Sequence, residues 1–163
     1  MTQQVYISDT NIWIDLRHAG LLDALFDLPI TLCCTDFVLD ELQDFDHTHL
    51  RARGLVVETL DEQATAALFP LMQAHNNSSL ADVSCYQLAK QTGRPLLTGD
   101  GRLRKQAQAD GLQVRGALWL LDQMVMHQII QPKNAAQHLQ SMLNSGARLP
   151  EADCQKRVAL WTA

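Results

Sequence analysis

The chain has 163 residues, of which 47% are hydrophobic and 19% are charged, and its formal net charge is −5. This length predicts one domain with a substantial core. The negative charge excludes a protein that holds nucleic acid mainly through a basic surface. Nucleic acid is not excluded as a substrate, because clustered carboxylates lower the apparent charge until they bind cations.

Two further absences set expectations about the cellular compartment. No stretch reaches the roughly 20 apolar residues of a membrane helix, and residues 1–4 lack the pattern of a secretory signal. The four cysteines form no C-x-x-C pair and no zinc-finger spacing, so they are expected as reduced thiols in or near the core. We therefore expect a cytoplasmic protein with no membrane segment.

Short apolar runs alternate with longer amphipathic stretches along the chain. In chain order, the first half predicts a strand at Val5–Ser8, helices at Asn11–Leu16 and Leu21–Phe26, a strand at Ile30–Cys34, a helix at Phe37–Phe45, a strand at Leu55–Glu58 and a helix at Glu62–His75. The second half predicts a helix at Leu80–Thr92, a strand at Pro95–Thr98, a helix at Gly101–Ala109, a strand at Gln113–Val114, and helices at Ala117–Ile130, Ala135–Leu143 and Ala152–Trp161. The alternation predicts a three-layer α/β/α sandwich with a mainly parallel central sheet of about five strands. Residues 1–131 are expected to form this α/β domain, and residues 132–163 a helical extension of it.

Acidic residues occur where a sheet of this kind places its ligand site. Asp9 and Asp100 directly follow predicted strands, and Asp82 lies where a loop enters a helix. Ligands of open α/β sheets bind beyond the carboxyl ends of the strands, and carboxylates gathered there would bind a hard cation such as Mg²⁺. Each aspartate also has a plain structural interpretation as the cap of the helix that it precedes or begins.

Asp82 and Glu41 each leave two interpretations open. Ser79-x-x-Asp82 fits a capping box, in which the acid bonds back to the cap residue. In its predicted helix, Glu41 lies at the edge of the buried stripe, whereas Asp40 and Asp44 point to the solvated side. A carboxylate near a core needs a partner, so Glu41 predicts either a salt bridge to an arginine or a metal.

Taken together, several segments resemble the PIN-domain family of metal-dependent nucleases. The segments that carry the resemblance are Ile7-Ser8-Asp9-Thr10-Asn11, Val38-Leu39-Asp40-Glu41-Leu42, Leu80-Ala81-Asp82, the run from Leu96 to Arg104, and the run from Val114 to Leu121. The resemblance covers roughly residues 5–124, and the order of the segments is more specific than any one of them.

The resemblance implies a site and an activity. The catalytic acids of the family map onto Asp9, Glu41, Asp82 and Asp100, with Asp9, Asp82 and Asp100 as ligands of Mg²⁺ or Mn²⁺. It also implies hydrolysis of RNA that leaves a 5′-phosphate, and the size of the chain resembles the toxins of toxin–antitoxin pairs. The partners expected on this basis are RNA, a small antitoxin protein and a second copy of the chain. The alternative is a PIN-like binding or scaffold module without catalysis.

Two polar residues, Asn11 and Thr98, are implied as supporting groups of this site. Many family members carry a further acid a few residues after the position of Asp100. Here Gly101, Arg102 and Leu103 occupy that stretch, so the sequence does not predict a full second metal site.

Other residues could serve a bound strand. Arg102, Arg104 and Lys105 begin the helix after Asp100 and are candidates for contacts with RNA phosphates, with a solvated helix face as the alternative. The segment from His47 to Arg53 is expected as a polar loop whose histidines are not metal ligands. The tryptophans are expected as core or interface anchors.

Overall fold

Five parallel strands form one sheet in the computed structural model, which describes residues 3–75 and 78–163. The strands are β1 (Val5–Ser8), β2 (Thr31–Thr35), β3 (Val56–Glu58), β4 (Leu96–Leu97) and β5 (Val114–Arg115). Their order in the sheet is β3-β2-β1-β4-β5, and every neighbouring pair is parallel. The chain moves outward from β1 in one direction through β3 and then returns to build β4 and β5 on the other side. The switch point of the sheet therefore lies between β1 and β4, where ligands of such sheets bind.

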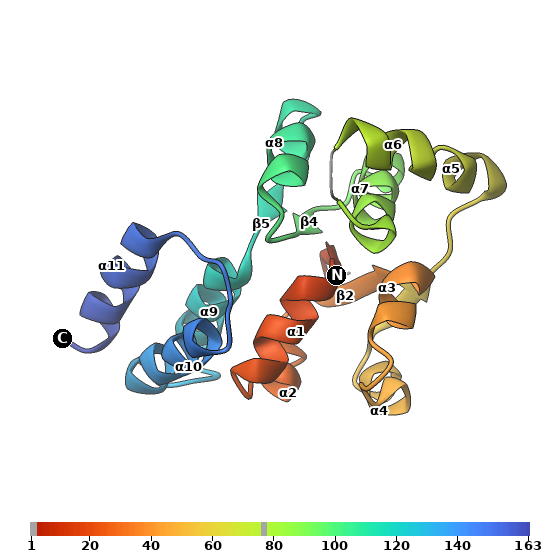
Figure 1. Cartoon of the computed structure of the whole chain (residues 1–163). Coiled ribbons are helices and arrows are strands. Elements are labelled where there is room, and N and C mark those ends of the chain that lie inside the picture. Colours follow the sequence, from red (N-terminus) through yellow and green to blue (C-terminus); the bar gives the residue numbers. More distant parts are fainter. Residues whose placement is uncertain (1–2, 76–77) are drawn as a thin grey trace.

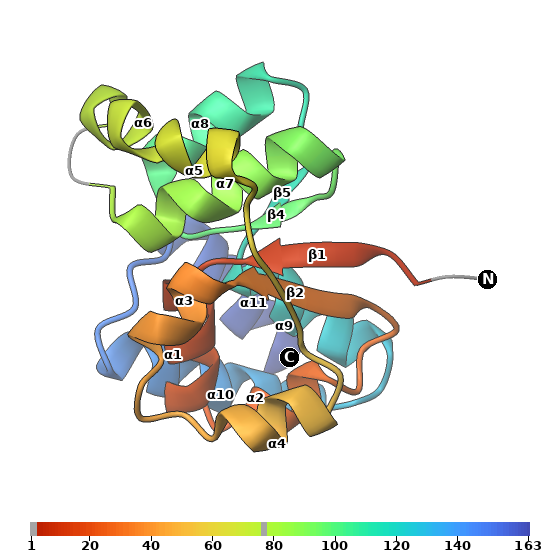
Figure 2. The same ribbon diagram turned by 90° about the vertical axis from the view of Figure 1, so that its right-hand side faces the viewer.

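Helices cover both faces of this sheet, which confirms the predicted three-layer α/β/α architecture (Figures 1 and 2). The helices of the first half are α1 (Thr10–His18), α2 (Leu22–Leu25), α3 (Asp36–Glu41), α4 (His47–Ala52), α5 (Glu62–Ala66) and α6 (Leu68–Ala74). Those of the second half are α7 (Leu80–Thr92), α8 (Gly101–Ala109), α9 (Ala117–Met126), α10 (Pro132–Asn144) and α11 (Glu151–Trp161). Figure 2 shows α5, α6, α7 and α8 on one side of β1 and β2, and α1, α2, α4, α9 and α10 on the other.

The central strand is the most deeply buried part of the sheet because helices cover both of its faces. Ile7 in β1 and Leu97 in β4 are fully buried, and α7 contributes the buried Val83 and Cys85 above them. Strands enclosed in this way read as continuous apolar runs, not as alternating ones. This explains why short apolar segments predicted the strands to within one or two residues.

One predicted loop is a helix in the structure. The segment expected as a polar loop from His47 to Arg53 forms α4, which Asp46 caps by accepting a hydrogen bond from the His49 backbone N–H at 3.0 Å. Only one of its residues, Leu50, is buried, so the segment lacks the repeated apolar spacing that signals a helix.

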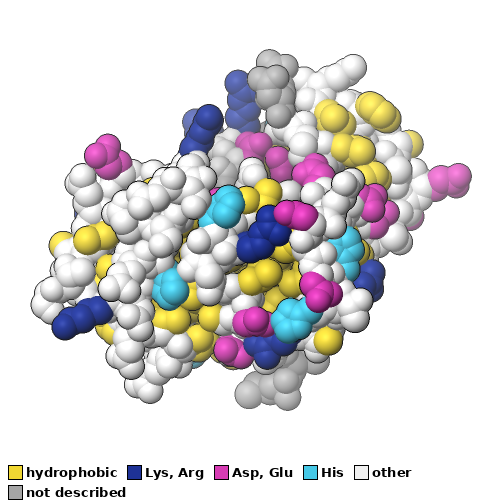
Figure 3. All heavy atoms as spheres, turned by 60° about the horizontal axis from the view of Figure 1, so that its bottom comes forward, with side chains coloured by type: hydrophobic (Ala, Val, Ile, Leu, Met, Phe, Trp, Pro, Cys, Tyr) yellow, Lys and Arg dark blue, Asp and Glu magenta, His cyan; other side chains and the backbone are white. Residues whose placement is uncertain are grey.

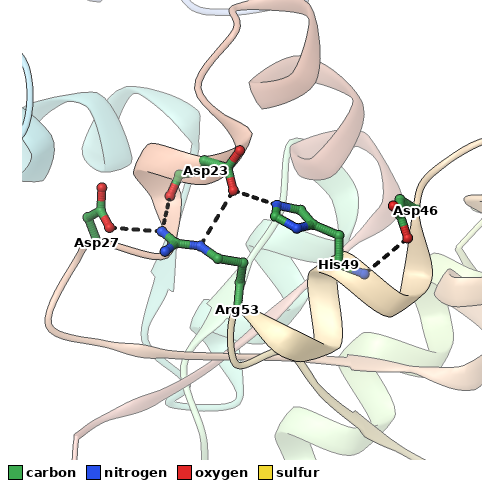
Figure 4. A network of polar contacts seen from close by, with 5 residues as sticks. All are labelled: Asp23, Asp27, Asp46, His49 and Arg53. Carbon is green, nitrogen blue, oxygen red and sulfur yellow. Dashed lines mark hydrogen bonds and ion pairs between the residues drawn. The ribbon is translucent and has the colours of Figure 1, made fainter.

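The side chains of α4 tie this helix to α2. The Arg53 guanidinium contacts Asp27 at 2.8 Å and Asp23 at 3.4 Å, and the His49 imidazole lies 2.7 Å from Asp23 (Figure 4). Surface pairs of this kind contribute little individually. Figure 3 shows the face that includes α2 and α4, where apolar side chains are visible between acidic, basic and histidine side chains.

Three predicted helices end early or are interrupted, each for a local reason, and the helix predicted as Leu21–Phe26 is one residue shorter at each end. The helix predicted as Phe37–Phe45 ends at Glu41, because Leu42 leaves helical geometry. The helix predicted as Glu62–His75 is broken at Ala67. Pro70 has no backbone N–H to donate to the preceding turn, so a helix continuous through this position would lose a hydrogen bond. The helix predicted as Ala117–Ile130 ends at Met126, just before the positive φ of 59° at Gln128.

The last two helices pack onto the sheet side that carries α1 and α9. Helix α10 contacts both of them through a buried stripe, and α11 packs on α10. An ion pair between Arg157 of α11 and Asp122 of α9, at 2.7 Å, joins these two helices. None of the helices within residues 3–75 and 78–163 has the length and apolar character to cross a membrane.

Candidate active site

Asp9 follows the central strand and is almost completely buried. One of its carboxylate oxygens caps α1 by accepting a hydrogen bond from the Ile12 backbone N–H at 3.1 Å. The other accepts from the Thr98 hydroxyl at 2.6 Å and from the Gly99 backbone N–H at 3.3 Å. The capping interpretation of Asp9 is thus confirmed, and the β4 end of the sheet holds the same carboxylate from the other side.

Asp100 follows β4, on the opposite side of the switch point from Asp9. Its Oδ1 caps α8 by accepting from the backbone N–H groups of Arg102 and Leu103 at 2.9 and 3.1 Å. Its Oδ2 accepts from the Ser78 hydroxyl at 3.0 Å. The Asp100 backbone N–H donates to Thr98 Oγ1 at 3.0 Å. Because this hydroxyl also donates to Asp9, Thr98 links the two carboxylates.

Asp82 is the third aspartate and lies in the first turn of α7. The Ser79 hydroxyl accepts from the Asp82 backbone N–H at 3.1 Å. Ser79 therefore caps α7, which is one half of the predicted capping box. Ser78 and Ser79 contact two of the aspartates, and no motif in the sequence points to the role of Ser78.

Glu41 and Asn11 lie at the edge of this arrangement. Glu41 is the last residue of α3 and is exposed, so its predicted place beside the core face is wrong. Because α3 ends at Glu41, the helical spacing that was used to orient this side chain does not apply to the residues after it. Asn11 is also exposed, in the first turn of α1.

The electrostatics of the four acids join them into one cluster centred on Asp82. Burial raises the pKa of Asp9 to about 7, with a further contribution from the Asp82 carboxylate. Burial also raises the pKa of Asp82 to about 6, with contributions from Asp100 and Glu41. All ion pairs formed among residues 3–75 and 78–163 lie elsewhere. No arginine therefore neutralises Glu41 within the described part of the chain, and no ion pair among these residues offsets the repulsion in the cluster.

The donor chemistry of this cluster fits a hard divalent cation. Its donors are all carboxylate oxygens, the type that Mg²⁺ and Mn²⁺ prefer, and their mutual repulsion would be relieved by a positive ion. No three His, Cys, Asp or Glu side chains within residues 3–75 and 78–163 are close enough together to hold a metal ion as they stand. Binding of one ion by three of these acids therefore requires their side chains to move toward it.

The three basic residues considered for strand contacts lie together on one helix. Arg102, Arg104 and Lys105 are all exposed on α8, immediately after Asp100.

The histidines of α4 and the tryptophans have structural contacts. His47 contacts the Leu42 carbonyl at 2.6 Å and His49 contacts Asp23, which agrees with their exclusion as metal ligands. Trp13 and Trp161 are buried in the core. Trp119 is half-buried and packs against Tyr6, with 5.1 Å between the ring centroids.

The Ser79 cap of α7 gives a stability prediction of moderate size. Ser79→Ala removes the hydroxyl that accepts from the Asp82 backbone N–H, and loss of such a cap costs about 1 kcal/mol. We expect urea denaturation to show a free energy of unfolding lower by about that amount. Ser141→Ala, at an exposed position in α10, serves as the control and should leave the unfolding curve nearly unchanged. Equal stability of the Ser79→Ala and wild-type proteins would show that this cap contributes nothing.

The fold and the cluster together define a doubly wound α/β protein with carboxylates at its switch point. A family model described as PIN domain matches residues 5–163. The chain therefore belongs to the PIN-domain family, whose members are generally nucleases that use divalent metals.

The solved structures include a similar fold. A PilT N-terminus domain protein from the hyperthermophilic archaeon Sulfolobus solfataricus P2 aligns with a TM-score of 0.53 and 12% sequence identity, over 73% of this chain and 92% of that one. At this identity the similarity supports the fold alone. A search of curated proteins finds no match to this chain.

Proposed function

We propose that this chain is an endoribonuclease that hydrolyses phosphodiester bonds in RNA with Mg²⁺ or Mn²⁺. The observation that carries the proposal is the buried Asp9 at the end of the central strand, whose pKa of about 7 reflects burial and the nearby Asp82 carboxylate. A buried acid beside a second carboxylate, with no basic partner among the residues that the structure describes, destabilises the fold, and such groups are typical of functional sites. Its place beside the switch point is where this class of fold binds ligands.

In this proposal the aspartates hold the cation and Glu41 completes the set. Asp9, Asp82 and Asp100 would be the ligands. When bound, the metal ion would supply a hydroxide at neutral pH and stabilise negative charge at the phosphate. Thr98 and Gly99 keep Asp9 oriented through their hydrogen bonds to Oδ2, and the exposed Glu41 can meet the substrate from the solvent side. Arg102, Arg104 and Lys105 on α8 would contact the phosphates of the strand without reading its sequence.

The direct test uses the wild-type protein and a 3′-labelled single-stranded RNA. We expect cleavage in millimolar Mg²⁺ or Mn²⁺, none in excess EDTA, and products that carry a 5′-phosphate. Restoration of cleavage when Mn²⁺ is added back in excess of EDTA controls for damage by the chelator. Cleavage that continues unchanged in EDTA, or no cleavage with either metal, would contradict the proposal.

We propose further that the nuclease acts as the toxin of a toxin–antitoxin pair, with a small antitoxin protein and a second copy of the chain as partners. Support comes from the size of the chain and the exposure of Glu41 at the site, which leaves the carboxylates open to a blocking partner. Induced expression should slow growth, and Asp9→Asn should restore it. Equal growth with the wild-type and variant proteins would contradict the toxin role.

One observation favours a second candidate, a binding module without catalysis. Asp9, Asp82 and Asp100 each take part in the capping of a helix, so each has a structural reason to be present. This candidate predicts that RNA binds without being cleaved in either metal. Cleavage of RNA that depends on Asp9 would exclude it.

A further inference from the structure

A cavity of about 890 Å³ lies beside the acidic cluster. Its walls come from the ends of β4 and β5, from α1, α8 and the start of α9, and from the connection between α10 and α11 together with α11 itself. Thr98 and Gly99, which both donate hydrogen bonds to Asp9, also line the cavity. A molecule in the cavity would therefore lie next to the buried carboxylate, and the volume is that of a small-molecule site.

Arginines gather in this cavity although the chain as a whole is acidic. Arg104, Arg115, Arg148 and Arg157 all line it. Arg157 is neutralised by Asp122, with contacts at 2.7 and 2.9 Å. The other three form no ion pair with any residue in the part of the chain that the structure describes. Unpaired guanidinium groups that face one cavity fit a phosphate, which they can hold with two hydrogen bonds each.

Arg115 has a further sign of an unfilled contact. Its Nε is buried and has no hydrogen-bond partner, and buried polar groups normally have one. Its guanidinium lies over the Trp119 ring, 5.7 Å from the centroid, which holds the two side chains together in the cavity wall. Arg104 reaches the same wall, because its guanidinium lies 3.4 Å from where a Cβ of the neighbouring Gly116 would be.

The rest of the lining adds two other kinds of contact. Trp119, Leu149 and Ile12 give it an aromatic and apolar wall, which suits a nucleobase because every base has a flat face that stacks. Asp15 and Asp153 supply carboxylates, which can accept hydrogen bonds from sugar hydroxyls. The cavity thus offers contacts for a phosphate, a sugar and a base. This set of contacts fits a nucleotide better than an inorganic anion.

We propose that this cavity binds one nucleotide of the RNA strand, adjacent to the phosphate that is cleaved. This rests on the proposed nuclease function, because the strand is taken to enter the cavity from the acidic cluster past Thr98 and Gly99. Arg104, Arg115 and Arg148 hold the phosphate of this nucleotide, and its base lies against the wall that Trp119, Leu149 and Ile12 form. Residues 132–163 thereby complete a substrate site together with the α/β domain, since Arg148 comes from the connection between α10 and α11.

The test measures binding without cleavage. A fluorescently labelled five-nucleotide RNA is titrated in EDTA against full-length wild-type protein, Arg115→Gln, Arg148→Gln and the double variant, at constant ionic strength. We expect about a tenfold weaker Kd for each single variant, as for loss of one hydrogen-bonded charge. The matched control is Arg51→Gln, an exposed arginine on α4 that is not part of the cavity lining, and this variant should bind within about twofold of wild type. Melting curves establish that each variant is folded.

Competition experiments identify what the cavity recognises. A nucleoside 5′-monophosphate should displace the labelled RNA at a lower concentration than inorganic phosphate does, and this advantage should disappear in the Arg115→Gln variant. Equal competition by the two would overturn the nucleotide assignment. A mononucleotide that binds as tightly as the five-nucleotide RNA would show a site for free nucleotides and overturn the strand assignment.

The outcomes separate this proposal from the nuclease function. RNA binding that depends on Arg115 and Arg148 in a protein that cleaves no RNA would support the cavity and contradict the nuclease. Cleavage of RNA with a KM that neither substitution changes would support the nuclease function and overturn the assignment of the cavity as a nucleotide site. Loss of binding in Arg51→Gln equal to that in Arg115→Gln would also overturn it, because the effect would then be one of total charge.

Discussion

Saturating Mn²⁺ raises the melting temperature of the wild-type protein by roughly 5–10 °C if the carboxylates bind a cation. A ligand that binds only the folded state at a hundred times its Kd stabilises it by about 2.7 kcal/mol, and for a domain of this size each kcal/mol shifts the melting temperature by about 2–4 °C. Burial raises the pKa of Asp82, and the ion would remove the repulsion from Asp100 and Glu41 that raises it further. Asp82→Asn should abolish most of the increase.

A matched control separates the effect of losing a metal ligand from the effect of losing a negative charge. Asp40→Asn removes the same charge from an exposed position on α3, one residue before Glu41, and should keep the full increase with Mn²⁺. Both variants are followed by thermal denaturation with and without metal. A purely structural role for Asp82 predicts a different pattern, in which Asp82→Asn lowers the metal-free melting temperature and Mn²⁺ leaves the melting temperature of every protein unchanged. That pattern would leave the binding module as the better account.

Without metal, the fold should become more stable as the pH is lowered from 8 to 5. The pKa of Asp9 is about 7 in the folded protein and about 3.9 in an unfolded chain, so the folded state holds the proton more tightly. The stabilisation from this proton is complete below about pH 4 and is lost as the pH rises through 7. A difference of about three pH units corresponds to roughly 4 kcal/mol. Asp82, with a folded pKa of about 6, contributes in the same direction.

The Asp9→Asn variant isolates this effect. Asparagine can still cap α1 but carries no charge to bury, so we expect the variant to be more stable than wild type at pH 8 in EDTA. The advantage should shrink toward pH 5, where Asp9 in the wild type is protonated. Urea denaturation at both pH values measures the difference, with Asp40→Asn as the control for lost charge. A difference between Asp9→Asn and wild type that is the same at both pH values would show that burial of this charge is not costly.

Local sequence patterns were sufficient to predict the strands and the strand-end acids. Val5–Ser8 is an apolar run that ends in an acid, and parallel strands must bring such ends to one edge. The same logic placed Asp9 and Asp100 on neighbouring strands, as observed. The position of Glu41 could not be predicted in this way, because it depends on where α3 ends, which propensities set only to within a few residues.

Features that depend on contacts distant in sequence were not visible in advance. Arg115, Trp119 and Arg148 belong to no shared motif, and they meet only because α10 and α11 fold back onto α1 and α9. Helix α4 was missed because it has a cap at Asp46 and contacts with α2 but no repeated apolar face that local sequence could show. In both cases tertiary packing decides what local sequence leaves open.

The most direct test of the proposed catalytic site is the initial rate of single-stranded RNA cleavage at saturating Mn²⁺ by Asp9→Asn, Asp82→Asn and Asp40→Asn. A bound metal ion contributes several kcal/mol to such reactions, and each 1.36 kcal/mol is a factor of ten in rate. We therefore predict a loss of at least about a hundredfold for Asp9→Asn and Asp82→Asn, in variants that melt no lower than wild type without metal. Asp40→Asn should cleave at the wild-type rate. Wild-type rates for Asp9→Asn and Asp82→Asn would contradict the assignment of these acids as the catalytic site.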